Sequence, residues 1–271
     1  MDEKSQVPLR IDVTVATKNN EATLARCLTA IRQNVPIKHL VVVDGGSTDS
    51  TLDIARRFNA RIFTETGLLG RVRYRQGKEC CTDWIAFVDS DVYVYPAWWP
   101  AMSRHIAGEN GMVVGIGESC YPSRTYFYEK YFNYNAKRFG LEAFSNTVVK
   151  RSLLLSCKPL LDGVHAGEDT VFANYVKLKG KRVVTVDECG PICYHDKHAD
   201  MPYAFFRSGQ SIGMTGDLMR AVRILPNNLR NWFVYSKNVS EFDPRLLAYI
   251  IYLWVVLIRG FFTSWLSEVK R

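Results

Sequence analysis

The architecture of the chain follows from the run Trp84-Ile85-Ala86-Phe87-Val88-Asp89-Ser90-Asp91, in which mostly apolar residues precede two acids. The apolar part predicts a buried β-strand, so that Asp89 and Asp91 leave the carboxyl end of that strand. Ligands of open α/β sheets bind outside the carboxyl ends of the strands. The spacing of the carboxylates suits a divalent cation on one and a nearby hydroxyl on the other. A solvent-exposed turn does not explain why acids follow an apolar run.

Two other acidic segments lie on either side of this strand. Val41-Val42-Val43-Asp44-Gly45-Gly46-Ser47-Thr48-Asp49 ends another apolar run, and Gly167-Glu168-Asp169-Thr170 lies further downstream. Apolar runs alternate with helical patterns, in the order that predicts an α/β fold with a mostly parallel sheet. We expect strands over 11–16, 40–43, 61–63, 84–88 and 112–116, and helices over 20–35, 51–58, 71–81 and 121–139.

With these segments in this order, the chain resembles a family 2 glycosyltransferase of the GT-A fold over about residues 11–195. The segments that carry the resemblance are 13–21, 44–51, Arg73, the Asp89/Asp91 pair and the Glu168-Asp169 pair. The resemblance implies a Rossmann-like, mostly parallel sheet flanked by helices. It also implies a nucleotide-sugar donor, a divalent cation and an acceptor.

The donor nucleotide is expected at the first two strand ends. The resemblance implies that Thr17, Asn19, Glu21 and Asp44 hold it, and the polar residues of both loops suit a base and a ribose. The alternative is that Asp44 only forms a turn and that Ser47 only caps a helix.

Arg73 lies where the family usually reads Ala-Arg-Asn, although here the residue after the arginine is Tyr74. Its implied role is to brace the nucleotide pocket or the metal-binding loop. The alternative is a solvated helix face, since Arg71, Arg75 and Lys78 also make this segment basic.

The metal site is expected at Asp91, which would bind Mg²⁺ or Mn²⁺, while Asp89 takes a ribose hydroxyl or a water on the ion. The resemblance implies that His195 completes the site, with a packed or surface histidine as the alternative. Asp196 is a second candidate. A zinc site over Cys189-x3-Cys193-x-His195-x2-His198 departs from the usual ligand spacings.

Glu168 and Asp169 precede an amphipathic helical pattern. The resemblance implies that this pair supplies the general base for in-line attack with inversion, with Asp169 as the base and Glu168 as an acceptor contact. The alternative is an acidic helix cap.

Composition sets the broader limits. The chain has 271 residues, a formal net charge of +8 and seven cysteines. Its basic charge predicts an anionic partner, and its odd number of cysteines favours a reducing compartment. The first ten residues show no signal-peptide core, which predicts a cytoplasmic catalytic face. We expect a catalytic domain over 1–199, with a nucleotide-sugar half over about 1–95 and an acceptor half over about 96–199, and a helical region over 200–271.

The region over 200–271 mixes basic and apolar residues and contains a thirteen-residue uncharged run over 246–258. That run is short for a bilayer span, so we expect an interfacial helix that holds the protein to the cytoplasmic face of the membrane, peripherally or monotopically. The alternative is a helical cap on the catalytic core.

Together these features predict an inverting, metal-dependent glycosyltransferase that uses a UDP- or GDP-sugar and a lipid-linked or saccharide acceptor. The other candidate is a non-catalytic, membrane-associated nucleotide-sugar-binding or scaffold protein. The segment 17–20 lacks the glycine fingerprint of a Rossmann dehydrogenase. The chain also lacks the phosphate loop of a nucleotidyltransferase and a nucleic-acid recognition motif, so we expect no nucleic-acid partner.

Overall fold

The computed structural model describes residues 10–120, 131, 134–135, 143–164, 166–187, 192–196, 201–214, 218–239 and 244–269. The chain divides into two compact units. The first, the sheet unit, comprises Met1–Glu118, Leu141–Gly163 and Asp169–Asp196. The second, the helical unit, comprises Ser119–Gly140, Val164–Glu168 and Lys197–Arg271. The expected boundary at residues 199 and 200 stays a prediction.

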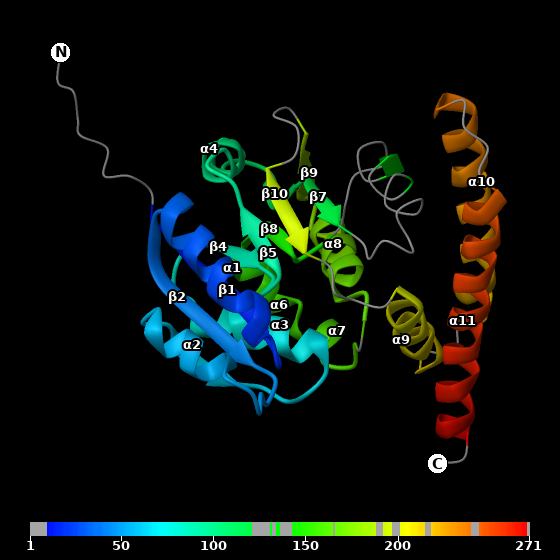
Figure 1. Cartoon of the computed structure of the whole chain (residues 1–271), viewed down its shortest axis with the longest axis horizontal. Helices are drawn as coiled ribbons and strands as arrows, with labels where there is room; N and C mark the ends of the chain where they lie inside the picture. Colours follow the sequence, from blue (N-terminus) through cyan, green and yellow to red (C-terminus); the bar gives the residue numbers. More distant parts are fainter. Residues whose placement is uncertain are drawn as a thin grey trace. The chain divides into compact units, whose positions relative to one another are not determined.

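A seven-stranded sheet forms the centre of the sheet unit, in the order β3-β2-β1-β4-β8-β6-β9 (Figure 1). Parallel pairing joins β1 to β2 and β4, β2 to β3, and β6 to β9, whereas β8 runs antiparallel to β4 and β6. This arrangement confirms the prediction of a mostly parallel α/β sheet. Its strands are β1 (Ile11–Thr17), β2 (Ile37–Asp44), β3 (Arg61–Thr64), β4 (Trp84–Val88), β6 (Asn110–Gly115), β8 (Asn146–Lys150) and β9 (Arg182–Val186).

Successive side chains of a strand point to opposite faces of a sheet, and here both faces are apolar and covered. On β2, Leu40 and Val42 face one core, whereas Val41 and Val43 face the other. The first core is shared with α1 (Glu21–Asn34), α2 (Thr51–Arg57) and α4 (Trp98–Ser103). The second is shared with α3 (Leu69–Glu79), α6 (Arg151–Ser156), α7 (Lys158–Leu161) and α8 (Glu168–Leu178).

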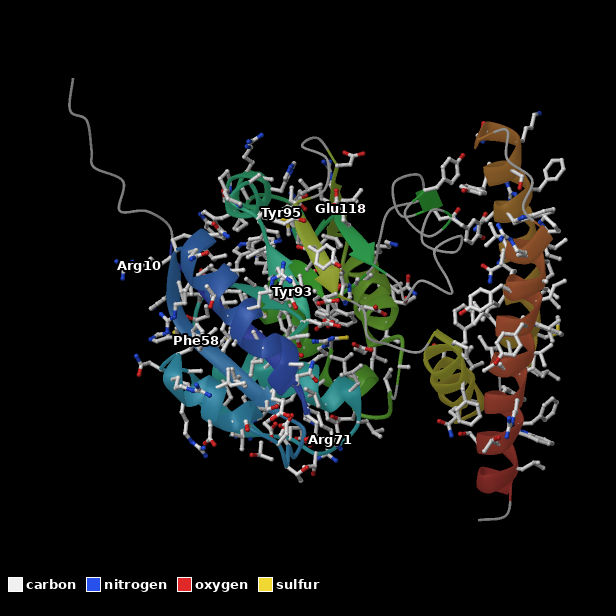
Figure 2. All side chains as sticks on the ribbon, in the orientation of Figure 1. Arg10, Phe58, Arg71, Tyr93, Tyr95 and Glu118 are labelled. Atoms are coloured by element: carbon white, nitrogen blue, oxygen red, sulfur yellow. The ribbon has the colours of Figure 1, made fainter. Side chains whose placement is uncertain are left out.

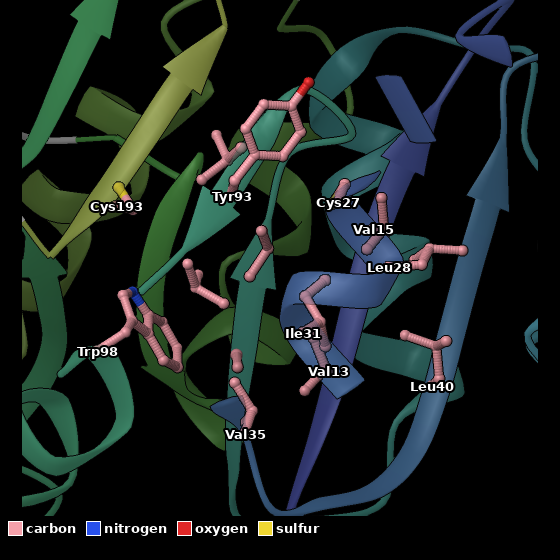
Figure 3. Close-up of a cluster of buried hydrophobic side chains, with 14 of the residues drawn as sticks. Val13, Val15, Cys27, Leu28, Ile31, Val35, Leu40, Tyr93, Trp98 and Cys193 are labelled. Carbon is pink, nitrogen blue, oxygen red and sulfur yellow. The ribbon is translucent and has the colours of Figure 1, made fainter. Parts of the chain in front are cut away.

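Helix α1 lies against β1 and β2 through a stripe of apolar residues at helical spacing. Figure 3 shows Leu28 and Ile31 of α1 beside Val13 of β1 and Leu40 of β2. The helix begins after Asn20 and ends before Pro36, as the sequence predicts, because proline cannot continue a helix.

A small second sheet, in the order β5-β10-β7, was missed by the sequence reading. Its strands are β5 (Val92–Val94), β7 (Gly117–Cys120) and β10 (Cys193–Asp196). Strand β5, between Asp91 and Pro96, is fully buried and pairs with β10. The hydrophobic pattern of the three residues of β5 cannot reveal that the strand pairs with β10, which lies about a hundred residues later in the chain. The expected helix over 121–139 falls almost entirely outside the described residues.

The helical unit contains α9 (Met201–Met214), α10 (Leu218–Val239) and α11 (Pro244–Val269). Glycines bring the backbones of α9 and α11 together: a Cβ at Gly209 would lie 1.9 Å from the Leu257 oxygen, and one at Gly260 would lie 2.1 Å from the Phe206 oxygen. Close crossings at small residues of this kind are typical of helices packed in membranes.

Helix α11 is longer than the uncharged run over 246–258. It continues through Arg259 to a length of 26 residues. Within the described part of the chain, the segment Pro244–Leu266 is the one helix with the length and apolarity to cross a membrane. By length and apolarity alone, α11 therefore suffices for a span, which the uncharged run over 246–258 did not predict.

Candidate functional site

Two loops at the carboxyl ends of β1 and β2 are tied together by hydrogen bonds. The strand register places Thr17 beside Asp44, so the loops begin side by side. The backbone N–H of Asn19 donates to Ser47 Oγ at 2.9 Å, and the N–H of Thr48 donates to Asn19 Oδ1 at 2.8 Å. The structure thus brings Thr17, Asn19 and Asp44 together at one edge of the sheet.

Glu21 belongs to the same pair of loops. Its carboxylate accepts a hydrogen bond from the N–H of Ser50 at 2.9 Å, and its own N–H donates to Asp49 Oδ2 at 3.1 Å. Asn20 adds a third link, because its N–H donates to Thr51 Oγ1. Side chains at the ends of β1 and β2 therefore form one cross-linked surface.

Asp44 is buried and its carboxylate holds the turn that follows β2. Oδ2 accepts hydrogen bonds from the N–H groups of Gly46 and Ser47, both at 2.9 Å, and Ser47 Oγ donates to Oδ1. Gly46 has a φ of 87°, a conformation that favours glycine. Ser47 does not cap the next helix, since α2 begins at Thr51 after Ser50.

The Thr17 side chain has a buried polar atom. Only 6% of this residue is exposed, and its Oγ1 has no hydrogen-bond partner among the residues that the structure describes. A buried polar group left unsatisfied costs about 1–3 kcal/mol. A ligand group at the end of β1 that hydrogen-bonds this hydroxyl would remove that cost.

Arg73 connects α3 to the acid at the end of β4. Its Nη1 donates to Asp89 Oδ1 at 3.0 Å and to Gln76 Oε1 at 3.3 Å. Gln76 in turn donates to Thr14 Oγ1 on β1 at 3.2 Å. The Arg73 side chain is only 6% exposed, so the alternative of a solvated helix face is wrong for this residue. Through this ion pair Arg73 holds Asp89 in place at the start of the loop after β4.

Asp91 and His195 meet across the small sheet. Asp91 lies directly before β5, and the register pairs His195 of β10 with Val92. His195 Nε2 lies 3.2 Å from Asp91 Oδ1, and both side chains keep a partly exposed surface. The backbone fixes this contact, because the N–H of Asp196 donates to the Asp91 carbonyl oxygen at 2.8 Å. One carboxylate oxygen and one imidazole nitrogen therefore face each other beside the loop that carries Asp89.

Other residues of the segment 189–198, whose spacing departs from that of usual zinc sites, make different contacts. Cys193 is buried, accepts a hydrogen bond from Asn146, and burial raises the pKa of its thiol to about 12. Asp196 accepts a hydrogen bond from Tyr93, which Figure 2 labels on β5. Burial and the Asp196 carboxylate raise the pKa of Tyr93 to about 12. Cys189 and His198 lie outside the described residues.

Glu168 and Asp169 occupy the first two positions of α8, after Gly167 with a φ of 79°. Glu168 is buried and Asp169 is half-buried. Asp169 Oδ1 accepts a hydrogen bond from the N–H of Thr170 at 2.8 Å. Both acids lie where negative charge favours the helix dipole, so the helix-terminus alternative and the general-base prediction both stay open for this pair.

An aromatic chain anchors the first turns of α8 to the rest of the site. The ring of Phe172 stacks on Phe144 at 5.4 Å, and Phe144 lies 4.9 Å from Phe87 of β4. The guanidinium of Arg73 lies 5.2 Å from the Phe144 ring. This buried cluster links α8, β4 and α3, and no sequence motif indicates it.

Comparison with known proteins extends these observations. The family model described as "Glycosyl transferase family 2" matches residues 12–154. The chain is 30% identical over 84 residues to "Uncharacterized glycosyltransferase RT0209" of Rickettsia typhi, a match that covers 30% of this chain and 28% of the relative. It is 29% identical over 111 residues to a Bacillus subtilis protein named as glycosyltransferase EpsH. That match covers 38% of this chain and 32% of the relative. The chain thus spans about a third of the length of these curated relatives.

Solved structures resemble the chain over a larger part. Glucosyl-3-phosphoglycerate synthase from Mycobacterium tuberculosis, in complex with phosphoglyceric acid, has a TM-score of 0.54 and 20% sequence identity. The match covers 75% of this chain and 78% of that protein. The same enzyme with Mn²⁺, uridine-diphosphate-glucose and phosphoglyceric acid has a TM-score of 0.52, 18% identity, and coverage of 75% and 77%. At this level of identity the likeness shows the fold.

Proposed function

Because the chain belongs to glycosyl transferase family 2 and has the GT-A fold, we propose that it transfers a sugar from a nucleoside-diphosphate sugar to an acceptor. The observation that carries the proposal is the meeting of Asp91 and His195 beside the Arg73–Asp89 ion pair, outside the carboxyl end of β4. Such strand ends are where open α/β sheets bind their ligands.

The donor atoms at Asp91 and His195 fit a divalent cation. Oδ1 and Nε2 lie 3.2 Å apart with both side chains partly exposed, so one ion can contact both after a small side-chain movement. An imidazole ligand favours Mn²⁺ over Mg²⁺, which prefers an all-oxygen shell. Complexes of the solved relative contain Mn²⁺ with uridine-diphosphate-glucose, which supports the same choice here. When bound, the ion would offset the negative charge that develops on the departing diphosphate.

The cross-linked loops after β1 and β2 supply the nucleotide side of the site. Their side-chain and backbone hydrogen bonds fix Asn19, Glu21 and Asp44 before any ligand arrives, which lowers the entropic cost of binding. Thr17 offers its unpartnered hydroxyl to a ribose or base group. Asp89, held by Arg73, is directed to a ribose hydroxyl or a water on the ion.

The proposed reaction is a single displacement with inversion. Asp169 removes the proton of the acceptor hydroxyl while that oxygen attacks the anomeric carbon and the bond to the diphosphate breaks. Glu168 orients the acceptor. The half-buried position of Asp169, second in α8, supports its choice over the buried Glu168, because the base must reach an acceptor that enters from solvent.

We further propose that the acceptor is lipid-linked and that the helical unit associates with the cytoplasmic face of a membrane. Supporting this, α11 is long and apolar, and the α9–α11 crossing uses glycines. The described cysteines are free thiols, which is consistent with a reducing compartment. Large apolar side chains are exposed on α10 and α11, namely Leu218, Met219, Val222, Phe233, Ile251, Tyr252, Val255, Phe262, Trp265 and Leu266.

The test is nucleoside-diphosphate release from UDP- and GDP-sugars with membrane lipid extract as acceptor, with Mn²⁺, with Mg²⁺, and with chelator. We expect release that needs the metal and that falls at least about 100-fold in Asp91→Ala. The matched control is Asp53→Ala, which removes an exposed acid of α2. Metal-dependent donor binding with no release under any condition would instead favour the non-catalytic, nucleotide-sugar-binding alternative. Absence of donor binding in calorimetry would reject both.

A further inference from the structure

A cluster of three potential metal ligands lies at the opposite edge of the seven-stranded sheet from the proposed donor site. Asp12 is near the start of β1, His39 is near the start of β2, and Cys81 precedes β4. The cluster therefore lies at the amino ends of these strands, whereas Thr17 and Asp44 mark their carboxyl ends. At about 3.3 Å per residue, the five steps from Asp12 to Thr17 separate the two sites by roughly 16 Å.

The three side chains direct their donor atoms to one point. His39 Nδ1 lies 2.9 Å from Asp12 Oδ1 and 3.5 Å from Cys81 Sγ. All three donor atoms lie within 4.8 Å of one another. A tetrahedral Zn²⁺ with bonds of about 2.0–2.3 Å places its ligand atoms roughly 3.3–3.7 Å apart. The two His39 separations are close to these values, and side-chain shifts of about 1 Å or less would bring all three donor atoms into such a shell.

The contacts do not fit a proton relay. In a Cys–His–Asp relay the thiol and the carboxylate bond to different nitrogens of the imidazole ring. Here both Asp12 and Cys81 contact the same nitrogen, Nδ1 of His39. Three donor atoms that converge on one point are instead the arrangement that a cation requires.

The backbone pre-arranges the carboxylate for a single metal bond. Asp12 is fully buried, and its Oδ2 accepts hydrogen bonds from the N–H groups of Cys81 and Thr82. Oδ1 is thereby left to face His39.

An irregularity in the strand pairing positions the histidine. Ile11 pairs with Ile37, but Val13 pairs with Leu40, so β2 has one more residue than β1 between these pairs. A bulge of this kind re-aims a side chain, and His39 is one of the two residues in it. His39 and Cys81 also keep an exposed surface, through which an ion and a water ligand can enter.

From this geometry we propose that Asp12, His39 and Cys81 form a Zn²⁺ site that joins β1, β2 and the segment between α3 and β4. Thiolate, imidazole and carboxylate are the ligand types that zinc takes, and a water would complete the shell. The bound ion would tie together three segments that are distant in sequence, at the edge away from the donor. It does not depend on the proposed transferase activity.

The test uses the full chain, stripped of metal with a chelator, and Zn²⁺ or Co²⁺ alone as the probe. We expect one equivalent of Zn²⁺ to bind in competition with a chromophoric chelator and to raise the melting temperature. Co²⁺ should give the near-ultraviolet charge-transfer band of a thiolate ligand. Cys81→Ser should weaken Zn²⁺ binding at least about tenfold and remove the band, and His39→Gln should weaken binding similarly. Cys81 is exposed, so its replacement by serine leaves the core intact.

Two control variants separate this site from the others. The Asp91→Asn, His195→Gln double variant removes the proposed donor-metal ligands and should keep both the band and the Zn²⁺ affinity. Cys157→Ala removes a buried thiol of the second core and should keep them as well. Zinc binding that is unchanged in Cys81→Ser, or a band that disappears in the Asp91→Asn, His195→Gln variant, would overturn the proposal. So would a wild-type chain that binds no Zn²⁺.

Discussion

Replacement of Arg73 by methionine isolates the ion pair that positions Asp89. Methionine keeps an unbranched apolar side chain in the buried site but removes the guanidinium that lies 3.0 Å from Asp89 Oδ1 and 3.3 Å from Gln76 Oε1. The change therefore leaves the Asp89 carboxylate at the end of β4 without its ion-pair partner. It also leaves the buried Gln76 amide oxygen without this donor. We expect a clear loss of stability.

The magnitude follows from the burial of the two partners. Removal of one member of a buried pair costs about 3–5 kcal/mol. The Arg73 side chain is 6% exposed, but Asp89 keeps 27% of its surface, so water stabilises the stranded carboxylate in part. We expect a loss of about 2–3 kcal/mol in the free energy of unfolding. This is a large fraction of the stability of a typical domain, which is about 5–15 kcal/mol.

Arg56→Met is the matched control. Arg56 pairs with Asp53 at 2.6 Å, but these side chains are 63% and 70% exposed, so its loss should cost no more than about 0.5 kcal/mol. Urea denaturation followed by circular dichroism measures both variants. Asp89→Asn gives a second check, because it removes the charge that Arg73 pairs with. In the Asp89→Asn background, Arg73→Met should lower the free energy of unfolding by at least about 1 kcal/mol less than it does in the wild type. If Arg73→Met and Arg56→Met lose the same stability, the ion pair does not brace the loop.

Two further predictions concern catalysis and location. Asp169→Asn keeps the size of the side chain but cannot accept a proton, so donor binding should survive while transfer at saturating donor falls by about 100-fold or more, with a smaller loss in Glu168→Gln. A wild-type transfer rate in Asp169→Asn would remove Asp169 from the mechanism, and a larger loss in Glu168→Gln would exchange the two roles. The full chain should float with anionic vesicles, and deletion of residues 245–271, which removes nearly all of α11, should release it. Release of the full chain by high salt would indicate surface attachment, whereas retention would indicate insertion. A full chain that stays in the soluble fraction at low salt would contradict membrane association.

The sequence predicted the first half of the sheet unit well because each element there is local. Strand β4 is a continuous apolar run, β2 contains the apolar run 40–43, and β1 alternates apolar residues with Asp12 and Thr14. Helix α1 is limited by Asn20 and Pro36. The carboxyl ends of parallel strands meet at one edge, so Asp44 and Asp89 could be assigned to that edge from their positions alone.

Contacts between distant segments could not be predicted in the same way. His195 was linked to the proposed metal site only through family resemblance, because the pairing of β5 with β10 leaves no periodic pattern in the sequence. The Asp12–His39–Cys81 cluster was missed entirely, since its members lie on three separate segments without a short ligand spacing. The uncharged run over 246–258 does not reveal the full length of α11, because the helix continues past Arg259, whose long side chain can extend from a helix without interrupting it.

The pairing of β5 with β10 also sets the order in which the site can mature during synthesis. Tyr93 and its partner Asp196 are 103 residues apart in the chain, and Asp91 and His195 belong to the same two segments. At about 5–20 residues per second, a ribosome needs roughly 5–20 s to extend the chain from one segment to the other. Within that interval the loops after β1 and β2 can form, and so can the Arg73–Asp89 pair. The nascent chain therefore has the proposed nucleotide-binding loops before His195 is synthesised. A chain arrested before residue 193 would have Asp91 without His195, so the proposed metal site would be the last part of the sheet unit to form.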